Sequence, residues 1–124
     1  MRVKTGIDII EVDRIKSSIE KLGEKFLKRV FTEEEIKYCN NKNKMKYQSF
    51  AARFTAKEAI LKAISGVLEN KYDISWLNIE ILNDENGRPN VKFIDYKLDL
   101  IDQIDISLSH IEEYAIANCV VILK

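Results

Sequence analysis

Two acidic residues in this sequence stand in settings where a carboxylate can do chemistry. Asp8 lies between Ile7 and Ile9 in an apolar stretch, and Glu58 lies in a helix-forming stretch with Lys62 four residues further on. Burying an aspartate is costly unless it is paired or binds a cation. Two carboxylates, completed by water and substrate phosphates, form a typical Mg²⁺ site because this ion prefers hard oxygen ligands. The alternatives are an Asp8 that faces water and a solvated Glu58–Lys62 pair.

A third candidate for chemistry is the only histidine. His110 ends a segment in which Ser107 and Ser109 alternate with apolar residues. Histidine titrates near neutral pH, so His110 could act as a general base or bind a phosphate. A structural role at a turn is the alternative. Neither serine stands in a GxSxG motif, so the sequence does not support a hydrolase triad.

Positive charge gathers in one segment. Six basic and two acidic residues lie between Arg14 and Arg29, which gives this segment a charge of +4 in a chain of zero net charge. Projected on one helix, four of the basic residues share a side beside the apolar face, and we call them the basic stripe: Arg14, Lys21, Lys25 and Lys28. Such a stripe suits an acidic protein helix or nucleic acid, and a solvated face is the alternative.

The composition argues against several other classes of protein. The 124 residues are 46% hydrophobic and 32% charged, so we expect one domain over residues 1–124. Because the 20 basic residues are balanced by 20 acidic ones, the overall charge does not indicate a protein that binds nucleic acid. No apolar run is long enough to span a membrane, and the first ten residues lack a signal-peptide core, so we expect a cytoplasmic protein with no membrane partner.

Several common metal-binding and nucleotide-binding motifs are absent from the sequence. Cys39 and Cys119 form no CxxC pair and only one histidine is present, so a structural zinc site and a disulfide framework are not expected. There is no GxxxxGK[ST] loop and no GxGxxG fingerprint. Any phosphates would then be held by basic side chains, which we expect to be Arg53, Lys57, Lys62 and loop lysines.

The elements that must position these residues can be read from apolar spacing and capping signals. In the first half, we expect a strand over Arg2–Ile10 and a helix over Asp13–Val30 that Gly23 weakens. A short helix is expected over Thr32–Asn41, where Thr32 and Glu35 form a capping box. A long helix is expected over Tyr47–Ser65, with Gly66 as its C-cap. Gly6 within the first strand predicts a bulge or a close approach.

The second half is expected to be mostly strands. Two hairpins are predicted, with a short helix over Tyr96–Ile101 between them; their strands are Ile74–Leu82, Arg88–Ile94, Ile104–Ser109 and Ala115–Leu123. The order favours an α+β domain in which one long helix packs on a mostly antiparallel sheet.

Taken together, these segments resemble a known family. The matching motifs run in order along the chain: Gly6-Ile7-Asp8-Ile9 with Arg14, Arg53-Phe54-Thr55-Ala56-Lys57-Glu58-Ala59 with Lys62, Gly87-Arg88-Pro89, and Ser107-Leu108-Ser109-His110 followed by Tyr114-Ala115-Ile116-Ala117. They are similar to holo-acyl-carrier-protein synthase, the short bacterial type of 4′-phosphopantetheinyl transferase.

The resemblance implies a fold, a reaction and a set of residue roles. It implies the α+β 4′-phosphopantetheinyl transferase fold, a homotrimer with active sites between subunits, and the Mg²⁺-dependent transfer of 4′-phosphopantetheine from coenzyme A to a serine of apo-acyl carrier protein, which releases adenosine 3′,5′-bisphosphate in fatty acid biosynthesis. Asp8 and Glu58 would bind the Mg²⁺ together with the pyrophosphate of coenzyme A. Lys62 would neutralise that pyrophosphate and assist the leaving group.

The remaining roles that the resemblance implies concern the nucleotide and the carrier. The nucleotide end of coenzyme A would lie among Arg53, Gly66, Gly87, Arg88, Pro89 and His110. Arg14 and the rest of the basic stripe would dock the acidic helix of the carrier protein. The base that takes the serine proton stays open between a metal-positioned water, Asp8 and His110. Two other functions also stay open: a non-enzymatic binding module for an acidic protein or RNA, and an enzyme that binds coenzyme A or hydrolyses a nucleotide.

Overall fold

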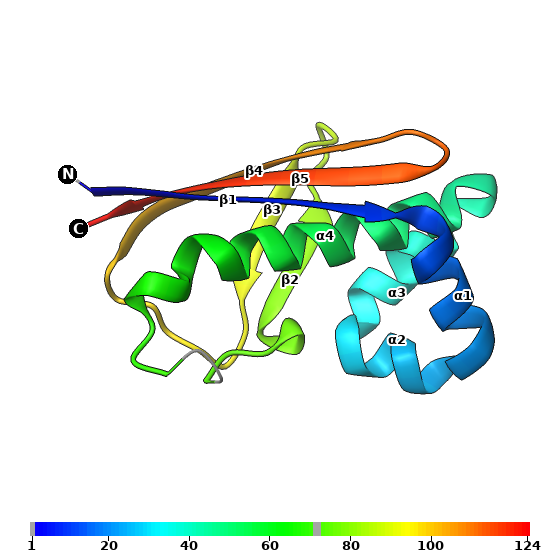
Figure 1. Cartoon of the computed structure of the whole chain (residues 1–124), viewed down its shortest axis with the longest axis horizontal. Coiled ribbons are helices and arrows are strands. Elements are labelled where there is room, and N and C mark those ends of the chain that lie inside the picture. The colour runs from blue at the N-terminus through cyan, green and yellow to red at the C-terminus, as the bar shows by residue number, and fades with distance from the viewer. Residues whose placement is uncertain (1, 71–72) are drawn as a thin grey trace.

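A three-stranded antiparallel sheet forms the frame of the molecule. The computed structural model describes residues 2–70 and 73–124 (Figure 1). The strands run in the order β1-β5-β4, and a separate antiparallel pair follows α4 in the chain. The bounds of the strands are β1 Arg2–Glu11, β2 Ile79–Asn83, β3 Pro89–Phe93, β4 Ile101–His110 and β5 Tyr114–Leu123.

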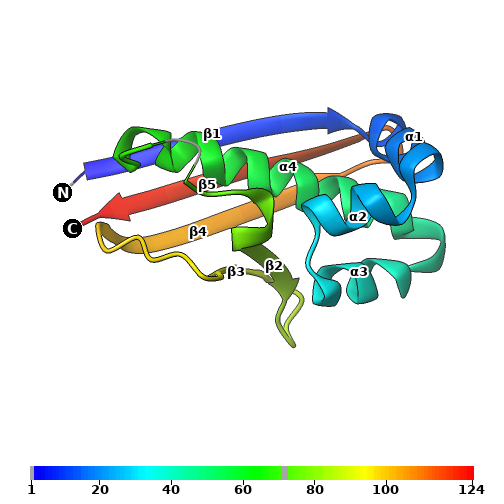
Figure 2. The same cartoon turned by 90° about the horizontal axis from the view of Figure 1, so that it is seen from below.

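The helices all lie on one side of that sheet (Figures 1 and 2). Their bounds are α1 Val12–Leu22, α2 Glu24–Val30, α3 Glu33–Asn40 and α4 Lys46–Ile64, with 3₁₀ turns η1 at Asn43–Met45, η2 at Ser65–Val67 and η3 at Trp76–Asn78. The long helix α4 runs along the sheet, and α1 to α3 gather at one end of it (Figure 2). The predicted arrangement of one long helix on a mostly antiparallel sheet is confirmed. In the described residues, no helix is both long and apolar enough to cross a membrane.

The close approach of β1 to α4 depends on Gly6. A Cβ atom on Gly6 would lie 1.9 Å from the carbonyl oxygen of Ala59 and 2.8 Å from the backbone nitrogen of Ala63. No side chain fits between the strand and the helix at this point. The register of β1 on β5 runs without interruption from Arg2 to Glu11, so the glycine marks a close approach and not a bulge. This contact carries Asp8, two residues later, to the surface of α4.

The prediction of one helix over Asp13–Val30 is wrong. Gly23 adopts φ 57° and ψ −132° and separates α1 from α2. A residue at positive φ cannot continue a right-handed helix, and glycine adopts this conformation without steric cost. The predicted capping box at the start of α3 is confirmed, because the Thr32 side chain accepts from the Glu35 backbone and the Glu35 side chain accepts from the Thr32 backbone.

Three other boundaries in the sequence interpretation need correction. The predicted helix over Tyr96–Ile101 is wrong, because Asp95 has φ 54° and Ile101 already begins β4. Gly66 is not a helix cap with positive φ but the middle residue of η2. The first hairpin strand begins at Ile79 and not at Ile74, because η3 comes before it.

A buried ion pair and two hydrogen bonds connect α4 to α3, α2 and η3. Lys57 and Glu35 are both 0% exposed, and the Lys57 ammonium lies 2.7 Å from Glu35 Oε1. The ammonium also donates to the carbonyl oxygens of Val30, at 2.7 Å, and Trp76, at 2.9 Å. Burial lowers the pKa of Lys57, and the facing Glu35 carboxylate opposes that shift. The expectation that Lys57 holds phosphates is wrong, since its ammonium is enclosed inside the protein.

Both cysteines are free and lie in the interior. Cys39 on α3 and Cys119 on β5 are 0% exposed. Burial raises the pKa of the Cys39 thiol to about 11 and that of the Cys119 thiol to about 12. Thiols with such values carry almost no thiolate at neutral pH, so neither cysteine is equipped to act as a nucleophile.

Candidate active site

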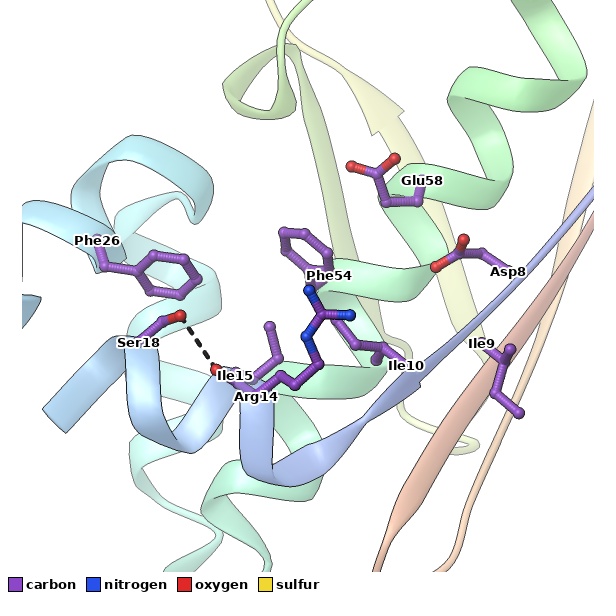
Figure 3. Close-up of a pocket in the computed structure, with 9 residues that line it drawn as sticks. All are labelled: Asp8, Ile9, Ile10, Arg14, Ile15, Ser18, Phe26, Phe54 and Glu58. Carbon is purple, nitrogen blue, oxygen red and sulfur yellow. Dashed lines mark hydrogen bonds between the residues drawn. The ribbon is translucent and has the colours of Figure 1, made fainter. Parts of the chain in front are cut away.

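Asp8 and Glu58 line the same cavity, as the magnesium hypothesis requires. The cavity has a volume of about 330 Å³ and lies where β1, α1, α2 and α4 meet (Figure 3). Figure 3 shows Asp8 on β1 beside Glu58 on α4, with the Phe54 ring and the Arg14 guanidinium next to them. The lining residues are Asp8, Ile9, Ile10, Arg14, Ile15, Ser18, Phe26, Phe54 and Glu58.

The Asp8 carboxylate is held by two side chains of α4. The Thr55 hydroxyl donates to Asp8 Oδ2 at 2.6 Å, and the Lys62 ammonium donates to Asp8 Oδ1 at 3.1 Å. Lys62 also donates to the Ile7 carbonyl oxygen at 3.0 Å. The Asp8 side chain is 18% exposed and the Lys62 side chain 56% exposed. Asp8 is therefore partly buried and paired, and the alternative of a strand-end aspartate facing water is wrong.

The Glu58 carboxylate has a different partner from the one its spacing suggests. Lys62 stands one turn along α4, but it pairs with Asp8. Glu58 Oε1 instead accepts a hydrogen bond of 2.8 Å from the indole nitrogen of Trp76. No sequence pattern pointed to Trp76 as this partner, because Trp76 lies 18 residues from Glu58 in a separate 3₁₀ turn. Thr55 was also missed as a partner of Asp8, although it stands within the motif that runs from Arg53 to Ala59.

The donor atoms at the cavity suit a hard divalent cation. Two carboxylates from separate elements line it, and Mg²⁺ is commonly bound by one or two carboxylates with water and substrate phosphates. Among the residues that the structure describes, no group of three or more histidine, cysteine, aspartate or glutamate side chains could hold a metal ion. A cation at Asp8 and Glu58 would thus take its other ligands from water and substrate.

The predicted nucleotide-binding residues lie away from this cavity within the chain. None of the cavity-lining residues is Arg53, Gly66, Gly87, Arg88, Pro89 or His110. Arg53 is 4% exposed, and its guanidinium lies 4.4 Å from the centre of the Tyr38 ring. Its Nη2 donates to Asn83 Oδ1 at 2.9 Å. The single chain therefore does not bring Arg53 to Asp8 and Glu58.

Of the predicted positions in the hairpin and at the end of β4, Gly87, Arg88 and His110 are exposed and Pro89 is partly buried. Gly87 has φ 80° in the turn between β2 and β3, a conformation that favours glycine. Arg88 follows it, and its guanidinium lies 3.9 Å from the Asp105 carboxylate, with both side chains mostly exposed. His110 ends β4 opposite Ala115 and is exposed.

The basic stripe is divided between two helices. Arg14 lines the cavity from α1, and Lys21 is exposed near the end of the same helix. Lys25 and Lys28 lie on α2 beyond the break at Gly23, and Lys28 lies 3.7 Å from Glu24 with both side chains exposed. The four side chains are exposed as predicted, but a projection on one continuous helix does not describe their arrangement.

Comparison with known proteins gives the same family from sequence and from structure. A family model described as the 4′-phosphopantetheinyl transferase superfamily matches residues 4–119. Holo-acyl-carrier-protein synthase of Ruminiclostridium cellulolyticum is 45% identical, covering 99% of this chain and 94% of its own. The corresponding protein of Protochlamydia amoebophila is 44% identical, covering 97% of this chain and 98% of its own.

Solved structures agree with the sequence matches. The holo-acyl-carrier-protein synthase of Bacillus anthracis, solved in complex with coenzyme A (3′,5′-ADP), has a TM-score of 0.77 and 35% identity over 95% of this chain and 94% of its own. The Helicobacter pylori enzyme, solved with coenzyme A, has a TM-score of 0.79 and 33% identity over 97% of this chain and 99% of its own. The predicted fold is confirmed, and the chain belongs to the 4′-phosphopantetheinyl transferase superfamily as a holo-acyl-carrier-protein synthase.

Proposed function

We propose that this protein transfers 4′-phosphopantetheine from coenzyme A to a serine of apo-acyl carrier protein. The serine hydroxyl attacks the phosphorus that bears pantetheine, the bond from that phosphorus to the adenosine 3′,5′-bisphosphate oxygen breaks, and adenosine 3′,5′-bisphosphate leaves. The observation that supports this reaction is the meeting of Asp8 and Glu58 at one cavity, with Lys62 beside Asp8. Phosphoryl transfer depends mainly on positioning and on neutralising charge, and this arrangement suits both.

In this proposal each charged side chain has a separate task. Asp8 and Glu58 would hold Mg²⁺, which supplies positive charge to the pyrophosphate when bound. Thr55 keeps the Asp8 carboxylate in place with its hydroxyl. Lys62, which is more than half exposed, can turn its ammonium towards the pyrophosphate and stabilise the leaving group. Of the two side chains considered as base, Asp8 lines the cavity, whereas His110 does not in the single chain.

The intact mass of an apo-acyl carrier protein tests the reaction directly. After incubation with this protein, coenzyme A and Mg²⁺, we expect the carrier mass to rise by one phosphopantetheine group, and we expect a chelator to prevent the rise. No gain with several carriers would overturn the proposal and favour the binding module. Release of phosphate or nucleotide without a carrier would favour a hydrolase. The role in fatty acid biosynthesis and the cytoplasmic location stay predictions.

The proposed homotrimer is supported by an apolar face of the sheet that none of the described helices covers. On the side of the sheet away from α4, side chains of β1 and β5 alternate outwards and are 37% to 60% exposed: Val3, Ile7, Ile9, Tyr114, Ile116 and Val120. We call them the outer apolar face. Contiguous apolar patches of this kind are typical of protein interfaces. A neighbouring subunit seated there could supply the nucleotide-binding residues that this chain places away from its own cavity.

Replacing an apolar residue of this face by a charged one should separate the subunits. Ile7 is 58% exposed in the single chain, and a carboxylate there would have to be desolvated at an interface. We expect Ile7→Glu to convert a trimer to monomers in analytical ultracentrifugation and to abolish transfer. The control is Leu100→Glu, whose side chain is 49% exposed outside this face and should leave the trimer intact. A monomeric wild-type protein, or a trimeric Ile7→Glu variant, would contradict the proposal.

Charge reversal in the basic stripe should weaken binding of the carrier protein more than binding of coenzyme A. We expect Lys21→Glu with Lys25→Glu to raise KM for the carrier about tenfold or more, because the exposed lysines attract an acidic partner, and to leave KM for coenzyme A nearly unchanged. Steady-state kinetics with each substrate varied in turn measures both constants. Lys92→Glu with Lys97→Glu, also exposed, is the control with the same change of net charge. Equal increases in the two constants would argue against this docking site.

A further inference from the structure

The hydrogen bond from Trp76 to Glu58 gives this tryptophan a role in metal binding. We propose that Trp76 is a positioning residue, which fixes the Glu58 carboxylate so that one oxygen is left for the Mg²⁺. This inference rests on the metal site of the proposed function. The indole nitrogen donates to Glu58 Oε1 at 2.8 Å, and no hydrogen bond reaches Oε2 from the described residues 2–70 and 73–124.

Trp76 is itself held from two directions. Its backbone carbonyl accepts a hydrogen bond of 2.9 Å from the ammonium of Lys57, which lies within the protein. Its ring packs against the Phe54 ring, with 5.7 Å between the ring centres and 42° between the planes. Phe54 lines the cavity next to Glu58 (Figure 3). The indole therefore has little freedom to leave the carboxylate.

The local backbone adds a further constraint. Trp76 is the first residue of η3, and this turn is closed by a capping box between Ser75 and Asn78. The Ser75 backbone nitrogen donates to Asn78 Oδ1 at 2.9 Å, and the Asn78 side-chain nitrogen donates to the Ile94 carbonyl oxygen at 2.8 Å. The turn is thus attached to the residue that follows β3, so the position of the indole is set by the fold.

The chemistry of the indole explains why it suits this task. An indole N–H is a donor only, so it cannot compete with the carboxylate for a cation. Glu58 accepts from this indole through Oε1, whereas Lys62, the lysine one turn along α4, pairs with Asp8. Groups that hydrogen-bond a metal-binding carboxylate orient it, and losing them commonly weakens metal binding about 10- to 100-fold.

The protein carries one tryptophan, so its fluorescence reports on this position alone. We expect Mn²⁺, added in the presence of coenzyme A, to quench the fluorescence of the unmodified protein in a saturable manner. The Glu58→Gln variant should lose the saturable quenching. Saturable Mn²⁺ binding seen by electron paramagnetic resonance without any change in fluorescence would overturn the inference. These measurements need no carrier protein, so a failure of the positioning role is distinguishable from a failure of the transfer reaction.

A single substitution separates positioning from packing. Trp76→Phe keeps an aromatic ring against Phe54 and removes the N–H donor. We expect the Mg²⁺ concentration for half-maximal transfer, and the Mn²⁺ dissociation constant, to rise about tenfold, while the rate at saturating Mg²⁺ stays within about threefold of the unmodified protein. Leu77→Ala changes a 39% exposed side chain in the same turn and keeps the indole donor. It is the control for a general loss of order in this turn. An unchanged metal requirement, or an equal loss of rate at every Mg²⁺ concentration, would overturn the inference.

Discussion

Asp8→Asn and Glu58→Gln should each lower the rate of transfer about 10³-fold at limiting Mg²⁺ and leave the fold intact. Each substitution keeps the size of the side chain and removes one of the two negative charges at the cavity. A cation site with one carboxylate binds Mg²⁺ more weakly, and the pyrophosphate then loses much of the charge stabilisation on which phosphoryl transfer depends. The rate is measured as the gain in carrier mass over time, and circular dichroism checks the fold.

The design of this experiment separates loss of the metal site from a general loss of negative charge. Glu34→Gln, an exposed glutamate on α3, serves as the matched control and should transfer at the rate of the unmodified protein. Raising the Mg²⁺ concentration should restore part of the activity of the two cavity variants. Activity near that of the unmodified protein in either variant at limiting Mg²⁺ would refute the role of that residue as a ligand.

Lys57→Met should produce the largest loss of stability among the charged residues. It removes the ammonium that faces Glu35 and leaves that carboxylate inside the protein without a counter-charge. Removing one partner of a buried ion pair typically costs about 3–5 kcal/mol. Two further hydrogen bonds are lost with it, those to the carbonyl oxygens of Val30 and Trp76. Chemical denaturation gives the free energy of unfolding.

Two further variants show whether the unpaired charge is the cause. Lys57→Met with Glu35→Gln removes both charges, so it should be more stable than Lys57→Met alone. Lys62→Met changes a lysine one and a half turns further along α4 whose side chain is 56% exposed. Its pair with Asp8 is partly solvated, so we expect a change of less than about 1 kcal/mol. Equal losses for Lys57→Met and Lys62→Met would mean that burial of the pair is not the source of the effect.

The parts of the fold that were predictable depend on neighbours in the sequence. The capping box at Thr32 and Glu35 and the long helix α4 follow from residues three or four positions apart. The meeting of Asp8 with α4 was expected as a possibility, and Gly6 was the local sign of it. The break at Gly23 was signalled by the glycine itself, but the apolar spacing continues across it and favoured one helix. The short helix expected at Tyr96–Ile101 does not form, because Asp95 has φ 54° and Ile101 already pairs with Leu123 of β5.

By itself, the sequence determined the family, the fold class and the residue types at the candidate site, because contiguous motifs and local periodicity contain that information. Only the tertiary structure decided which side chains meet. Asp8 is bound by Thr55 and Lys62, which are 47 and 54 residues away, and Glu58 by Trp76, which is 18 residues away. The tertiary structure also buries Lys57 against Glu35, so this lysine is not available to bind phosphates. Hydrogen bonds and desolvation act over a few ångströms in space, and residue spacing along the chain does not specify contacts between elements.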